Sequence, residues 1–135
     1  MTATDQAIEI ARAAAEAAIK LNAHDIVALD VSELNPFTDV FLILTGSSQR
    51  NVAAIADAVQ DTLVEQGVKQ RGREGRDVGE WVLQNFGDVV VHTFQQEARE
   101  FYALERIWNT APVLDLGITE AEPEPVRAGA EDLLP

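Results

Sequence analysis

The stretch VFLILTGSSQRNVAAIAD, from Val40 to Asp57, decides the fold of this chain. Its first segment, VFLILT, is continuously apolar and β-prone, which is typical of a central strand covered on both faces. A Gly-Ser-Ser turn follows, and beyond it the apolar residues recur at helical spacing. These residues are Val52, Ile55, Ala56, Val59 and Leu63, and Gly67 ends the pattern. A buried strand that runs directly into an amphipathic helix indicates a layered α/β protein.

On the N-terminal side of this stretch, the sequence predicts one helix and one further strand. Residues Thr4–Leu21 are rich in alanine and carry a narrow apolar stripe, and Thr2 or Thr4 can cap the helix. Residues Asp25–Val31 form a short, largely apolar segment that suits a strand. The Asn-Pro pair that follows it marks a loop.

On the C-terminal side, the sequence predicts three strands and a helix. A weak strand is expected at Val68–Arg73. Two clear strands, Glu80–Phe86 and Asp88–Phe94, are so close together that they predict a tight hairpin. A last helix is expected from Gln96 to Trp108. The order of elements therefore predicts an α/β fold, with a mixed β-sheet of about five strands flanked by helices.

The composition excludes several classes of protein. The 135 residues suit a single domain. No apolar run approaches the roughly 20 residues that a membrane helix needs, and the N-terminus carries no secretory signal. The absence of cysteine excludes disulfides, thiolate metal sites and cysteine nucleophiles. A cytoplasmic location is the simplest interpretation.

The net charge of −13, from 10 basic and 23 acidic residues, limits the kinds of partner. It opposes direct binding to DNA, because phosphate backbones are bound by clustered lysine and arginine. It favours a partner with a basic surface, because complementary potentials speed encounter. A soluble acidic protein without such a partner would carry the same charge, so both interpretations stay open.

The residues from Pro112 onward differ in composition from the rest. They contain six acidic residues, one basic residue, four of the five prolines and no aromatic residue. Such a composition is typical of a disordered tail. We therefore expect one α/β domain over residues 1–111 and an acidic, proline-containing tail over residues 112–135. A short binding motif within the tail is an open alternative.

The turn Gly46-Ser47-Ser48 is the most enzyme-like feature, because free N–H groups at a helix start can hold a phosphate. A nucleotidyltransferase built on this turn would also need closely placed carboxylates to hold a divalent metal. The next acidic residues, Asp57 and Asp61, lie inside the following helix, and the chain has no Asp-x-Asp pair. A tight turn with a serine as helix cap is favoured over this alternative, and no cofactor is predicted.

The histidines give no catalytic or metal site. His24 and His92 are the only two, which is too few for a histidine-rich metal centre within one chain. Asp88 and His92 would point to the same side of their strand, but roughly 13 Å apart. They are too far apart for a hydrogen-bonded catalytic pair, and a structural histidine satisfied by a neighbour is favoured.

The last predicted helix carries a candidate docking surface. Tyr102 shares one face of it with Arg99 and Arg106, and exposed tyrosine and arginine together are typical of interface anchors. The opposite side is apolar and is expected to face the sheet. The apolar residues are Phe101, Leu104, Ile107 and Trp108.

The hairpin repeats this arrangement. Trp81 and Leu83 share one face of their strand, and Val82 lies on the other. If Val82 faces the core, Trp81 and Leu83 are accessible to a partner. An alternative, in which Trp81 is buried beneath a helix, stays open.

Taken together, five blocks of the chain resemble the ribosomal silencing factor family (RsfS, also called Iojap). They are LDVSELNPFTDVFLILTGSSQRNVAAIAD, REG, EWVL, GDVVVH and REFYALERIW, in the family's order and spacing. The resemblance implies a nucleotidyltransferase-like α/β fold without an enzymatic role. It implies binding to the large ribosomal subunit, through a ribosomal protein on the subunit-joining face. There the factor would block the small subunit sterically and repress translation when nutrients are scarce. A homodimer is a further implication.

The resemblance also implies which residues bind the partner. Trp81 belongs to the EWVL block and Tyr102 to the last block, and both are expected to face the ribosome. Where the family usually has an aspartate, this chain has Asn85, which would remove a charge contact if that carboxylate meets a basic group. The full expected partner-binding set is Trp81, Leu83, Asp88, His92, Glu97, Arg99, Tyr102 and Glu105, with no catalytic or metal-binding residue.

Overall fold

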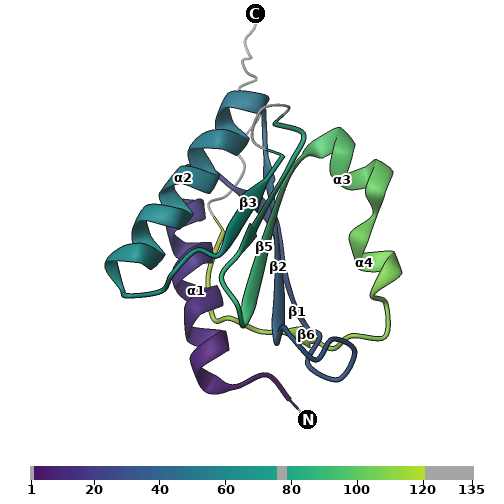
Figure 1. The fold of residues 1–135 in the computed structure, drawn as a ribbon. Coiled ribbons are helices and arrows are strands. Elements are labelled where there is room, and N and C mark those ends of the chain that lie inside the picture. Colours follow the sequence, from purple (N-terminus) through teal and green to yellow (C-terminus); the bar gives the residue numbers. More distant parts are fainter. Residues whose placement is uncertain (1, 76–78, 121–135) are drawn as a thin grey trace, which may run out of the picture.

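The protein folds into a mixed β-sheet with helices on both faces (Figure 1). The structure is a computed structural model that describes residues 2–75 and 79–120. The helices are α1 (Asp5–Ile19), α2 (Gln49–Glu65), α3 (Gln96–Tyr102) and α4 (Leu104–Ile107). The strands are β1 (His24–Asp30), β2 (Val40–Gly46), β3 (Gly72–Glu74), β4 (Trp81–Asn85), β5 (Val89–Gln95) and β6 (Val113–Leu114). The predicted α/β class is confirmed.

The strands are arranged in the order β3-β4-β5-β2-β1-β6. β2 and β5 pair in parallel at the centre of the sheet, and the other neighbouring strands pair antiparallel. Every residue of β2 is buried, as expected for a strand with packed side chains on both faces. The sequence predicted about five strands, and the additional strand is β6, which lies in the expected tail.

Helices α1 and α2 lie side by side on one face of the sheet (Figure 1). Thr4 Oγ1 accepts a hydrogen bond from the Ala7 N–H at 3.1 Å and caps α1. Ser48 Oγ accepts from the Asn51 N–H at 3.0 Å and caps α2. The buried stripe of α1 consists entirely of alanine, which lets the helix pack closely on the strands. Both predicted helices and the proposed serine cap are confirmed.

The predicted hairpin is formed by β4 and β5. Trp81 pairs with Phe94 at one end of it, and Asn85 pairs with Val90 at the other. Gly87 adopts a φ of 88° in the turn, a conformation that glycine adopts without steric cost. None of the helices within residues 2–75 and 79–120 has the length and apolar character that crossing a bilayer requires.

The expected single helix Gln96–Trp108 is wrong, because the chain breaks at Ala103 into α3 and α4. Ala103 has a φ of 45° and so leaves the right-handed helical conformation. The break divides the apolar stripe that one continuous helix would have turned toward the sheet. Leu104 is buried, but Phe101 and Ile107 are 81% and 69% exposed. These two residues therefore belong to the surface and not to the core.

The segment 112–120, expected to lie in the tail, packs against the domain instead. Its strand β6 pairs with β1, and its Leu116 is only 4% exposed and packs among the residues under α1. Arg12 Nε donates to the Leu116 carbonyl at 2.6 Å. The expected boundary at residue 111 was placed from the composition of the segment. That composition gave too little weight to the apolar residues Leu114, Leu116 and Ile118. Residues 121–135 lie outside the described part of the chain.

Candidate docking face

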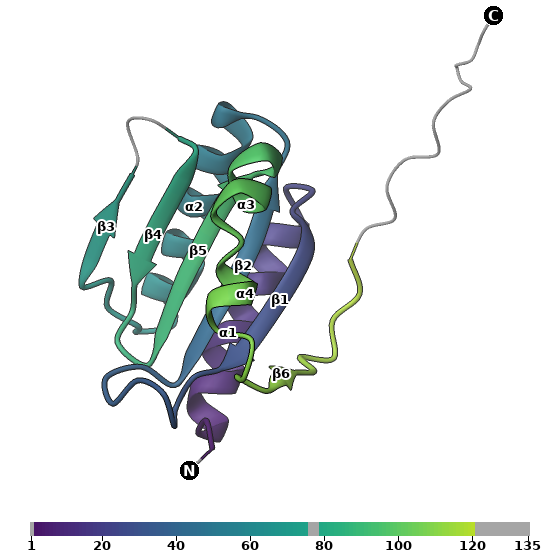
Figure 2. The same ribbon diagram turned by 90° about the vertical axis from the view of Figure 1, so that its right-hand side faces the viewer.

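One half of the sheet's second face has no helix over it. Helix α3 packs on β5 and β2, whereas β4 and β3 stand free at one edge of the sheet (Figure 2). Because side chains alternate along β4, Val82 points to the α2 side, where it is fully buried, and Trp81 and Leu83 point to the free side. Trp81 and Leu83 are both partly exposed. Of the two arrangements left open by the sequence, Val82 faces the core, and Trp81 and Leu83 keep part of their surface accessible while they pack against the neighbouring core cluster.

Aromatic rings from β4, β5 and α3 meet on this side of the sheet. The Trp81 ring stacks on Phe94, with ring centroids 4.9 Å apart, and lies 4.8 Å from the Tyr102 ring of α3. Phe101 contacts Tyr102 edge to face at 5.0 Å. Tyr102 is 42% exposed. We call Trp81, Leu83, Phe101 and Tyr102 the aromatic face.

His92 lies beneath this face. It is 4% exposed, and its Nδ1 accepts a hydrogen bond from Trp81 Nε1 at 3.1 Å. Since an indole N–H can only donate, the neutral imidazole must carry its proton on Nε2. Burial lowers the pKa of His92 from 6.5 to about 4, so the ring is uncharged at neutral pH. The predicted structural histidine is confirmed in that Nδ1 has a neighbour as hydrogen-bond partner, whereas Nε2 has none among the described residues.

Arg99 is placed differently from the prediction. It was expected to share an exposed face with Tyr102, but only 7% of it is exposed. The reason is that α3 rests on the sheet through Ala98 and Arg99 and not through its apolar stripe. The guanidinium donates to Glu105 Oε2 at 2.9 and 3.1 Å, to Thr45 Oγ1 at 2.5 Å and to the Asp25 carbonyl. Arg99 therefore joins α3 to α4, β1 and β2 from inside the molecule.

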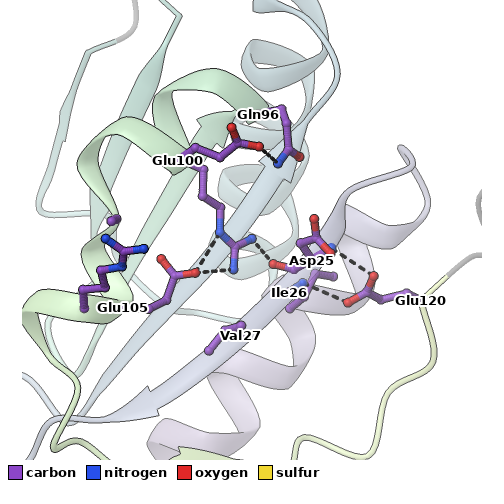
Figure 3. Close-up of a pocket in the computed structure, with 10 residues that line it drawn as sticks. Asp25, Ile26, Val27, Gln96, Glu100, Glu105 and Glu120 are labelled. Atoms are coloured by element: carbon purple, nitrogen blue, oxygen red, sulfur yellow. Dashed lines mark hydrogen bonds and ion pairs between the residues drawn. The ribbon is translucent and has the colours of Figure 1, made fainter.

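A cleft of about 660 Å³ lies beside these bonds, between α3–α4 and β1. Figure 3 shows Glu105 on its helical side and Asp25 with Ile26 on the strand side. Glu120 accepts hydrogen bonds from the N–H groups of Asp25 and Ile26, at 3.0 and 2.8 Å. Three charged groups of this cleft, Arg99, Glu105 and Glu120, thus serve internal contacts that hold α3, α4, β1 and the segment 112–120 together.

The acidic residues of the expected partner-binding set do not form one cluster. Glu97 is exposed in the first turn of α3, close in sequence to the aromatic residues of that helix. Glu105 is partly exposed, and its carboxylate is paired with Arg99. Asp88 is exposed in the β4–β5 turn, at the opposite end of the hairpin from Trp81. The structure therefore brings together Trp81, Leu83, His92 and Tyr102, and leaves Asp88 apart.

The Gly46-Ser47-Ser48 turn has a structural explanation. An added Cβ at Gly46 would lie 2.8 Å from Val52 Cγ2, so glycine permits close packing of α2 against β2. The Ser47 N–H donates to Asn51 Oδ1 at 2.9 Å. Asp57 is paired with Arg73 at 2.9 Å. Within the described ranges, no group of three His, Cys, Asp or Glu residues could hold a metal ion.

Phe101 is the surface residue that the sequence pattern missed. Its spacing with Leu104 and Ile107 matches an apolar helical stripe, which predicts burial. The signal for its exposure would have been the burial of Arg99, which lies two residues earlier on the opposite side of the helix, but an arginine at a sheet-facing position is rare. Only the break at Ala103 and the internal partners of Arg99 explain why Phe101 faces outward.

Comparisons with known proteins agree with the fold. A family profile described as "Ribosomal silencing factor during starvation" matches residues 4–132. Ribosomal silencing factor RsfS of Bacillus subtilis is 42% identical over 107 residues, covering 79% of this chain and 91% of that protein. RsfS of Chromobacterium violaceum is 42% identical over 100 residues, covering 74% and 82%. A crystal structure of a Chromobacterium violaceum protein superposes with a TM-score of 0.73 at 38% identity, covering 85% of this chain and 95% of that one.

Proposed function

The chain belongs to the ribosomal silencing factor family, whose members repress translation by binding the large ribosomal subunit and are not enzymes, and we propose that its aromatic face docks on that subunit. The partner in this proposal is a ribosomal protein on the subunit-joining face. Once docked, the domain occupies the space that the small subunit needs. Joining is then prevented by steric exclusion, and translation falls when nutrients are scarce.

The clustering of the exposed Phe101 and Tyr102 rings with the partly exposed Trp81 ring is the observation that carries this proposal. Interfaces are enriched in Tyr, Trp and Phe, and the anchors that dominate binding energy sit in central, well-packed positions. Trp81 and Tyr102 fit this description, because each is accessible yet held by ring contacts to its neighbours. Leu83 and Phe101 extend the apolar centre on either side.

The charged rim of the proposed contact is acidic. Glu97 and Glu105 lie on α3 and α4, and Asp88 would reach a more distant part of the partner from the hairpin turn. With a net charge of −13, the chain suits a basic ribosomal protein, because complementary potentials speed encounter. Arg99 and His92 support the contact from beneath and do not touch the partner.

Cosedimentation with purified large subunits tests the site. Removing a central aromatic anchor typically costs about 2 kcal/mol, or roughly thirty-fold in affinity. We expect Tyr102→Ala and Trp81→Ala to lose binding by about that factor while their circular dichroism stays that of a folded protein. Val64→Ala is the matched control, because Val64 is an exposed apolar residue of α2 on the other side of the sheet. If the two aromatic variants pellet with large subunits as the parent does, the aromatic face is not the docking site.

Self-association belongs to the proposal as a competing use of the same face. A homodimer that covers Trp81 would hide the docking residues, so dilution to the monomer should strengthen apparent binding to large subunits. A dimer formed elsewhere would leave the affinity independent of dilution. A role on the ribosome is compatible with the cytoplasmic location that the sequence favours.

A further inference from the structure

A hydrogen bond between two neighbouring strands fixes the ring of Trp81. Trp81 of β4 pairs with Phe94 of β5, and His92 lies two residues before Phe94 on the same face. The indole N–H of Trp81 reaches diagonally to His92 Nδ1 at 3.1 Å. An indole on the free side of a sheet can also adopt the flipped orientation, which stacks on neighbours but points its N–H elsewhere. The bond to His92 selects one of the two orientations.

The surroundings of His92 are apolar, so the imidazole costs the fold free energy that an apolar side chain would not. Phe41 lies 4.9 Å from the imidazole in an edge-to-face contact, and Phe94 stacks at 6.4 Å. Among the described residues, His92 Nε2 is buried and has no hydrogen-bond partner. An apolar ring at this position would fill the same space without an unsatisfied N–H group. The imidazole therefore contributes something that packing alone does not require.

We propose that His92 is a positioning residue, whose Nδ1 orients the Trp81 indole so that it presents the aromatic face to the partner together with Tyr102. The inference rests on the proposed docking function, and it reassigns His92 from a contact residue to a residue that acts through Trp81. The Tyr102 ring lies 4.8 Å from the Trp81 ring, so a flipped indole would also change the support that Tyr102 receives. One buried acceptor thus sets the geometry of two anchors, the partly exposed Trp81 and the exposed Tyr102.

Two substitutions separate this role from simple packing. His92→Phe keeps a ring and removes the acceptor, whereas His92→Asn places an amide oxygen close to the position of Nδ1. His92→Leu serves as a second acceptor-free variant if phenylalanine overfills the site. The Trp81 indole N–H is followed by its nitrogen-edited NMR signal and its exchange with water, with the signal assigned through Trp81→Phe. Affinity for purified large subunits is measured on the same samples.

We expect the Trp81 indole signal of His92→Phe to shift and its exchange with water to quicken. We also expect a roughly tenfold loss of affinity, although the variant is at least as stable as the parent. His92→Asn should restore both the indole signal and the affinity. An unchanged indole signal in His92→Phe overturns the inference, as does a parent-like affinity of that variant. Trp81→Ala on the same subunits tests the docking proposal separately, because parent-like binding of that variant removes the docking site whatever the indole signal shows.

Discussion

Arg99 and His92 are polar residues buried among apolar neighbours, and the structure accommodates them in two different ways. Arg99 keeps its charge, because its guanidinium has hydrogen bonds to Glu105, Thr45 and the Asp25 carbonyl. His92 is instead neutral at physiological pH, because burial lowers its pKa from 6.5 to about 4. A buried group that must stay neutral makes the stability of the fold depend on pH.

The pH dependence through His92 has a definite sign. The unfolded chain binds the proton with a pKa near 6.5, and the folded chain binds it only near 4, so protonation favours unfolding. The contribution of neutral His92 is fully present above about pH 6.5 and is lost as pH falls from there to 4. We expect a loss of about 3 kcal/mol over this window from His92. Urea unfolding at a series of pH values should show a flatter profile for His92→Asn, and identical profiles would contradict the burial of a neutral imidazole.

Among the elements, α3 and α4 do most to create the aromatic face. The two short helices cover only part of the sheet and leave β4 uncovered on that side (Figure 2). Tyr102, the last residue of α3, contacts the Trp81 ring of β4 at 4.8 Å, and Phe101 contacts Tyr102. The break depends on Ala103, whose left-handed conformation costs an alanine about 1–2 kcal/mol. The surrounding bonds, including Ala103 N–H to the Arg99 carbonyl at 2.9 Å, hold it there.

Substituting glycine at Ala103 tests this account. Glycine adopts the left-handed conformation without steric cost, but it loses more entropy on folding. We expect Ala103→Gly to raise the free energy of unfolding by about 1 kcal/mol and to leave the affinity for large subunits unchanged. The matched control is Ala54→Gly inside α2, which should lower the free energy of unfolding by about 1 kcal/mol. A destabilised Ala103→Gly protein would show that the strain lies elsewhere.

An element can be predicted from the sequence when the residues that determine it lie within the element itself. Strand β2, helices α1 and α2 and the hairpin carry their signals locally, as runs, caps and periodicity, and the sequence predicted all of them. The break at Ala103 and strand β6 depend on partners far away in the chain, such as Asp25 for Arg99 and Ala28 for Leu114. For the same reason the sequence placed Trp81 and Leu83 on the side of β4 opposite Val82, whereas it predicted neither the burial of Arg99 nor the exposure of Phe101.

For the molecule as a whole, the two edges of the sheet are protected unequally. The edge at β3 is short, which limits pairing with another chain. The edge at β1 is longer and is covered by the segment 112–120, which crosses it from the α4 side to the α1 side. Ala111 packs in the cluster under α4, whereas Leu116 packs in the cluster under α1. Glu120 then holds the N–H groups of Asp25 and Ile26, where β6 does not reach.

Two truncations measure what this segment contributes. A chain that stops after residue 120 keeps the contacts that the structure describes for the segment within residues 2–75 and 79–120, so we expect the free energy of unfolding of the full chain. A chain that stops after residue 111 loses buried Leu116, the bond from Arg12 and the Glu120 bonds. Burial of a leucine contributes about 1.5–3 kcal/mol and each of the three hydrogen bonds about 0.5–1.5 kcal/mol, so we expect a loss of roughly 3–7 kcal/mol in urea unfolding.

The shorter chain should also self-associate, because an uncovered β1 presents unpaired backbone groups to a second copy. Sedimentation velocity at several concentrations would detect this, and Glu120→Gln in the full chain should remain monodisperse, because β6 still covers Ala28 and Leu29. Equal unfolding midpoints for the two truncations would instead place the end of the domain at residue 111. The position of that end decides whether the segment 112–120 is an appendage or the part of the fold that keeps the sheet to a single chain.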